Sequence, residues 1–80
     1  MPYISTKDRL RLFNGASPET PGELNFVITT LIKAYYLRKG SSYQTFNDVI
    51  GALEGAKLET YRIDIAPYED MKRKENGEVE

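Results

Sequence analysis

Residues 20–35 read TPGELNFVITTLIKAY and carry the clearest local signal in the chain. Thr20 is a favoured helix cap, a proline takes the first helical position, and Glu23 stands three residues after the cap, which together make a capping box. Gly40 follows two basic residues, as is typical of a helix end. Between these signals, apolar residues recur at steps of three and four: Leu24, Val27, Ile28, Leu31, Ile32 and Tyr35. The stretch predicts a long amphipathic helix over residues 20–40.

Two further helices are predicted on either side of this one. A short helix lies within residues 1–15 and is closed by Asn14 and Gly15, which tolerate left-handed backbone. A second long helix covers residues 45–71. Its apolar stripe is formed by Phe46, Val49, Ile50 and Leu53, and is continued, slightly rotated, by Leu58, Tyr61 and Ile65. Ile63 lies off this stripe, so we expect that helix to meet neighbours on more than one side.

The expected fold is all-α: a short N-terminal helix followed by an antiparallel hairpin of two long helices. Pro67 breaks or kinks the last helix, because proline lacks an N–H and its ring meets the preceding turn. Residues 1–80 form a single helical domain, in which residues 72–80 are a charged flexible tail.

Composition narrows the possible functions. The chain has 80 residues and contains neither cysteine nor histidine. Disulfides, thiolate catalysis, Cys/His zinc sites and histidine acid–base chemistry are therefore excluded. A chain this short buries a small core, and small proteins without disulfide bonds or bound metals often gain stability by self-association. We expect a homo-oligomer.

Charge and hydropathy argue against a duplex-DNA partner and a membrane partner. Eleven basic and twelve acidic residues almost cancel, whereas a duplex-DNA-binding protein usually shows a basic excess. No apolar run is long enough to span a bilayer, and the N-terminus lacks the layout of a signal peptide. We expect no membrane and no duplex-DNA partner, and a cytoplasmic location.

Small residues cluster in the middle of the second long helix. Gly51 and Gly55 are four residues apart and share a helix face, where each glycine costs about 1 kcal/mol against alanine. Three explanations stay open: close packing against the first long helix, a symmetric contact with a second copy, or a close-packed ligand.

The carboxylates do not form a metal-binding pattern. Glu54, Glu59 and Asp64 recur every five residues and so spiral around the helix, while Glu69 and Asp70 are adjacent and splayed. Helical magnesium-dependent hydrolases need acids that converge from facing helices. We expect solvated charges with local ion pairs, no metal, no cofactor and no catalytic residues, with a nucleotide hydrolase as a distant third hypothesis.

Basic and aromatic residues gather at two places. The N-terminal set is Tyr3, Arg9 and Arg11, and the set on the second long helix is Lys57, Tyr61 and Arg62. A ring that stacks on a base and a cation that binds a phosphate are the minimum for holding a nucleotide. The alternative is an amphipathic surface with snorkelling side chains. Six tyrosines without tryptophan suit interfaces and ligand pockets equally.

Two long segments resemble a small tailed-phage protein family of unknown function. They are residues 20–29 (TPGELNFVIT) and residues 42–59 (SYQTFNDVIGALEGAKLE), and the ending Ala66-Pro67-Tyr68-Glu69-Asp70 with Asn76-Gly77 fits as well. The resemblance covers most of the chain and implies a phage origin without naming an activity.

The last helix also resembles the closing helix of phage anti-CBASS sponge proteins. The resemblance rests on Arg62, Pro67 and Glu69, with Leu53 and Ala56 upstream. Those proteins are all-helical hexamers that sequester cyclic oligonucleotide signals. The resemblance implies that Arg62 matches their arginine near the helix end and that Tyr3 is a base-stacking tyrosine. One departure is the lack of a lysine within residues 20–23.

The sequence supports two binding hypotheses. In the first, a phage accessory protein in the host-cell cytoplasm sequesters a cyclic di- or trinucleotide without turnover, as a homo-oligomer that the resemblance implies to be a hexamer. In the second, a small helical inhibitor or adaptor binds a host protein through its tyrosine-rich surface.

Overall fold

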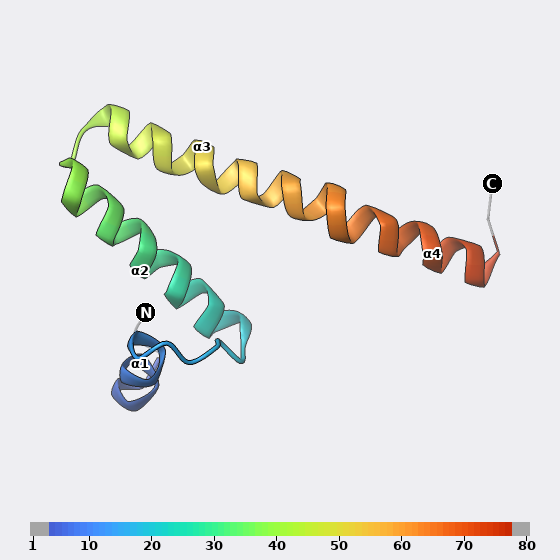
Figure 1. The fold of residues 1–80 in the computed structure, drawn as a ribbon, viewed down its shortest axis with the longest axis horizontal. Coiled ribbons are helices and arrows are strands. Elements are labelled where there is room, and N and C mark those ends of the chain that lie inside the picture. Colours follow the sequence, from blue (N-terminus) through green and yellow to red (C-terminus); the bar gives the residue numbers. More distant parts are fainter. Residues whose placement is uncertain (1–3, 78–80) are drawn as a thin grey trace. The chain divides into compact units, whose positions relative to one another are not determined.

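The computed structural model describes residues 4–77, which contain helices and no strand (Figure 1). The expected all-α class and the order of one short helix followed by two long ones are confirmed. The elements are α1 (Thr6–Phe13), α2 (Pro21–Lys39), α3 (Tyr43–Thr60), the π-helical segment η1 (Tyr61–Ile65) and α4 (Ala66–Asn76).

The chain divides into two compact units, residues 1–45 and residues 46–80, and each is described by itself. Unit 1 contains α1 and α2, and unit 2 contains most of α3 together with η1 and α4. The antiparallel packing of the two long helices and the single domain stay predictions.

Capping side chains set the helix starts in unit 1. The Ser5 hydroxyl accepts a hydrogen bond from the Asp8 amide, and the Thr20 hydroxyl accepts one from the Glu23 amide, each at 3.1 Å. The Glu23 carboxylate reaches back to the amide of Glu19 at 2.9 Å rather than to that of Thr20, so the capping box is closed one residue early. Gly40, with φ of 95°, ends α2 as expected.

Helix α3 begins earlier than the sequence predicts. The Ser42 hydroxyl accepts a hydrogen bond from the Thr45 amide at 3.1 Å, so Ser42 caps the helix and Tyr43 is its first residue. The boundary expected at residue 45 was therefore too late. A serine or threonine hydroxyl can cap a helix by accepting a hydrogen bond from an amide two or three residues later. Both Ser42 and Thr45 carry such a hydroxyl, so the sequence allowed either residue as the cap.

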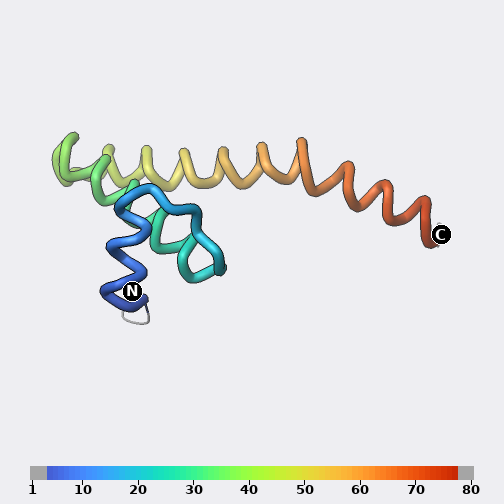
Figure 2. The backbone as a smooth tube through the Cα atoms, turned by 60° about the horizontal axis from the view of Figure 1, so that its bottom comes forward, coloured from blue at the N-terminus to red at the C-terminus, as the bar shows by residue number. Residues whose placement is uncertain are grey.

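The irregularity expected at Pro67 is confirmed, but it is a widened turn and not a break. The Ala66 amide bonds to the carbonyl of Tyr61, five residues back, and helical backbone continues through Pro67 (Figures 1 and 2). A proline ring clashes with the carbonyl four residues before it, and a π turn is one way a helix accommodates such a defect.

Helix α4 extends to Asn76, beyond the end that the sequence predicts at Met71. Ion pairs three residues apart join Lys72 to Glu75 at 3.3 Å and Asp70 to Arg73 at 3.5 Å, and Gly77 ends the helix with φ of 81°. Charged residues with strong helix propensity therefore add a last turn.

Candidate functional site

Unit 2 presents a row of large apolar side chains to solvent, which we call the apolar stripe. From Ile50 to Gly77 every residue is exposed except Ala66. The members of the stripe are 37–64% exposed: Phe46, Ile50, Leu53, Leu58, Tyr61, Ile65 and Tyr68. Exposed apolar patches of this kind mark interaction surfaces in soluble proteins.

The π-helical segment η1 lies within the stripe, from Tyr61 to Ile65, and Tyr68 follows three residues later. Tyr68 was not predicted as a member of the stripe, although its three-residue step from Ile65 was the available signal.

The three candidate ligand residues of unit 2 do share one short stretch of helix, but each already has an acidic partner. Lys57 lies 3.7 Å from Glu54, and Arg62 donates to both carboxylate oxygens of Glu59 at 3.0 and 3.1 Å. The partner of the third candidate, Tyr61, is Glu69, which accepts a hydrogen bond from the phenol at 3.2 Å. A phosphate bound here has to displace carboxylates.

The Tyr61–Glu69 contact perturbs the titration of the phenol. The hydrogen bond to the Glu69 carboxylate, together with the negative charge of that group, raises the pKa of Tyr61. The proton is therefore held on the phenol, which acts as a donor and not as an acid.

Of the three N-terminal candidate ligand residues, the structure describes Arg9 and Arg11. Tyr3 lies outside the described residues. The Arg9 Nε donates to the carbonyl of Ile4 at 3.0 Å. Arg11 lies 2.6 Å from Glu23 and also reaches Asp8 at 3.4 Å. The contact between Arg11 and Glu23 was not visible as a sequence pattern, because it depends on how the connector returns the chain from α1 to α2.

The Arg11–Glu23 pair ties the two helices of unit 1 together. Glu23 is only 8% exposed, and its hydrogen bond from Arg11 lowers its pKa, while the same bond raises the pKa of Arg11. Arg11 is thus occupied by a structural ion pair that also satisfies the capping carboxylate of α2. A ligand that recruited Arg11 would leave a buried carboxylate unpaired.

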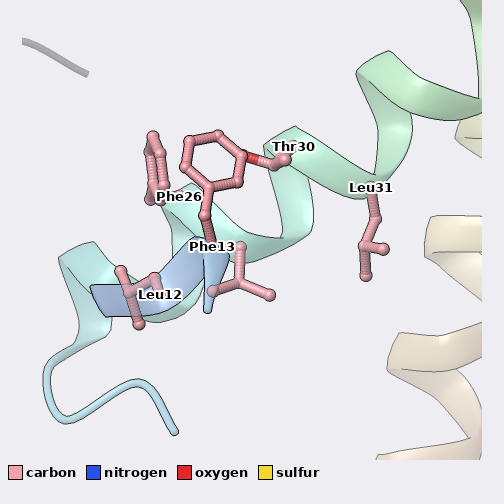
Figure 3. A pocket seen from close by; sticks show the side chains of 6 residues that line it. Leu12, Phe13, Phe26, Thr30 and Leu31 are labelled. Carbon is pink, nitrogen blue, oxygen red and sulfur yellow. The ribbon is translucent and has the colours of Figure 1, made fainter. Parts of the chain in front are cut away.

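Unit 1 also contains an apolar cavity of about 200 Å³ (Figure 3). Its lining comes from α1 and α2: Leu12, Phe13, Phe26, Val27, Thr30 and Leu31. Phe13 and Phe26 meet edge to face with ring centroids 5.8 Å apart. Ligand pockets usually enclose about 300–1,000 Å³, so this cavity suits a single apolar side chain better than a nucleotide.

Gly51 and Gly55 of α3 face open space. A Cβ added at Gly51 or Gly55 would meet nothing within 4 Å. Within unit 2, therefore, neither glycine allows a second backbone to approach, and the explanation by a contact with a second copy stays open.

Neither a metal site nor a membrane-spanning helix is found among residues 4–77. No three acidic side chains in this part of the chain gather closely enough to hold a metal ion. None of the described helices combines the length and apolar character that crossing a membrane requires.

The fold and the surface define a class of small all-helical proteins with an exposed apolar helix face. The model of a domain of unknown function, DUF6899, matches residues 1–79, and the chain belongs to this family. No curated protein and no solved structure matches the chain.

Proposed function

We propose that this protein acts by binding another protein through the apolar stripe of unit 2, as a small helical inhibitor or adaptor. The observation that carries the proposal is the exposure of the stripe, with Tyr68 at 56% and Tyr61 at 49%. Tyrosine is enriched in protein interfaces because it combines an apolar ring with a polar tip. An amphipathic helix that lays such a face into a groove is a common mode of recognition.

The charges beside the stripe support a protein partner. Cations and carboxylates alternate along the helix, where Lys57 pairs with Glu54 and Arg62 with Glu59. A surface of mixed sign gives no broad positive field that would attract a polyanion, but it can specify a partner and an orientation.

Photo-cross-linking in cells that make the protein tests this proposal. A photoreactive phenylalanine analogue replaces Tyr68 on the stripe or, as the matched control, Ile63, which is equally exposed at 54% but lies off the stripe. We expect a discrete protein adduct from position 68 and none from position 63. Equal labelling from both positions, or no adduct from either, would contradict the proposal.

A phage sponge for cyclic oligonucleotides is the second candidate, and one arrangement favours it. Lys57, Tyr61 and Arg62 lie on consecutive turns of one helix, and the Arg62 and Lys57 side chains are 72% and 74% exposed. Copies of this set from several protomers could surround the phosphates of a cyclic di- or trinucleotide in the host cytoplasm. A hexamer is the assembly that the sequence resemblance implies.

Calorimetry with cyclic di- and trinucleotides tests the sponge. Because a charge-assisted contact to phosphate contributes about 1.5–3 kcal/mol, Arg62→Ala should weaken binding about tenfold or more. Arg73→Ala is the matched control, since Arg73 also pairs with a carboxylate three residues before it, that of Asp70. Absence of heat with the wild-type protein would exclude the sponge.

A further inference from the structure

We propose that the partner of the apolar stripe is a second copy of this chain, running antiparallel, with the twofold axis at the level of Ile63. This inference rests on the proposed function, that the stripe binds protein, and assigns the stripe of the unbound protein to a second copy, which another protein partner has to displace. It accounts for a long helix on which every residue from Ile50 to Gly77 except Ala66 is exposed.

Four of the seven residues of the stripe match one another about that level. Leu58 and Tyr68 stand equally far before and after Ile63, and so do Tyr61 and Ile65. In an antiparallel pair, Leu58 therefore faces Tyr68 of the second copy, and Tyr61 faces Ile65. All four side chains are 40–58% exposed in the single chain and become covered together.

The charges match in the same register. Glu54 faces Lys72 of the second copy, and Lys57 faces Glu69, so that the twofold axis generates four opposite-charge pairs. A parallel pair in register would instead place each of these charges against its own copy. The pairs that the single chain makes, Glu54 with Lys57 at 3.7 Å and Lys72 with Glu75 at 3.3 Å, are exposed and weak, so they can be exchanged.

The helix has a physical need for such a partner. Most helical stability in proteins comes from packing of an apolar face, and Gly51, Gly55 and Pro67 all lower the intrinsic helix propensity of this segment.

Charge reversal tests the register by sedimentation equilibrium. Glu54→Lys and Lys72→Glu should each weaken the dimer about tenfold, because each sets like charges against one another. The double variant Glu54→Lys/Lys72→Glu should recover wild-type affinity. It breaks the contacts of both residues with Lys57 and Glu75 in the same chain, so recovery can only come from pairs between chains. A double variant weaker than either single variant would overturn the proposed register.

Disulfide trapping tests the direction of the helices. The chain has no cysteine, so Leu58→Cys and Tyr68→Cys introduce single thiols. We expect a mixture of the two variants to cross-link rapidly and each variant alone to cross-link slowly, because like positions lie about 15 Å apart along an antiparallel pair. Rapid cross-linking of each variant alone would show a parallel pair and refute the proposal.

The two proposals fail differently. A chain that sediments as a monomer at millimolar concentration refutes self-pairing. If position 68 still yields a discrete adduct with another protein in cells, binding through the stripe stands with a different partner. If it yields none, the proposed function fails as well.

Discussion

The hydroxyl of Tyr61 donates a hydrogen bond to the carboxylate of Glu69, eight residues further along the same helix and 3.2 Å away. This contact spans the π-helical segment and enters α4 beyond Pro67. It joins a member of the apolar stripe to the charge that we pair with Lys57 of a second copy. The local distortion of the helix and the placement of the binding surface are therefore linked.

The titration of Tyr61 tests that contact. Because hydrogen bonding to Glu69 raises the pKa of Tyr61, its tyrosinate absorbance should develop at higher pH than that of an ordinary tyrosine. The contact stabilises the fold below the ordinary tyrosine pKa, and this contribution is lost as pH rises through the raised value. Subtracting the ultraviolet titration of Tyr61→Phe from that of the wild type isolates the group. Glu69→Gln should move its midpoint down, and an unchanged midpoint would exclude the contact.

Replacing Pro67 tests the origin of the π segment. Pro67→Ala restores an amide donor and removes the clash with the preceding turn, so the segment should return to α-helical bonding and gain up to about 3 kcal/mol in helix propensity. Self-association should nevertheless weaken, because Ile65 and Tyr68 rotate about the helix axis relative to Leu58 and leave the register that the pair requires. Circular dichroism and sedimentation equilibrium measure the two effects. A variant that associates more tightly would show that the π segment does not set the stripe.

The start and end of α2 could be predicted from the sequence, whereas the start of α3, the end of α4, the π segment and the tie between α1 and α2 could not. Thr20 and Gly40 act on backbone groups a few residues away, so their effect on the helix ends can be read from the local sequence. The steps from Tyr61 to Ile65 and Tyr68 fit an α-helix equally well, so the sequence does not reveal an inserted residue. The site could be predicted only as a set of exposed aromatic and charged residues, because the acidic partners of Lys57 and Arg62 compete with any ligand.

Acid should destabilise unit 1 through Glu23. Its pKa is lowered in the folded chain by the hydrogen bond from Arg11, so the unfolded chain binds the proton more readily. The pair therefore stabilises the fold above the ordinary glutamate pKa, and this contribution is lost as pH falls through the lowered value. Thermal unfolding across this range should show a steeper loss in wild type than in Glu23→Gln. Parallel curves would exclude the linkage.

Arg11 should matter more to stability than the arginines on the surface of unit 2. Arg11→Ala leaves the buried Glu23 carboxylate without its cation, whereas Arg62→Ala removes one exposed contact with Glu59. We expect a clear drop in Tm for Arg11→Ala and almost none for Arg62→Ala. Equal effects would show that the Arg11–Glu23 pair does not hold α1 against α2.

Gly51 and Gly55 should tolerate alanine. Neither site has an atom within 4 Å of an added Cβ, and each replacement should raise helix stability by about 1 kcal/mol. Thermal unfolding of Gly51→Ala and Gly55→Ala measures the gain. A loss of stability or of assembly in either variant would place a second backbone against that glycine.

Amide hydrogen exchange over residues 46–76, followed from high to low protein concentration, tests most directly whether the apolar stripe is an interface between molecules. We predict slow exchange in the concentrated protein and progressively faster exchange on dilution, because each helix loses the partner that covers its apolar face. Slow exchange at every concentration would show that the stripe is covered within its own chain, and that result would contradict the account.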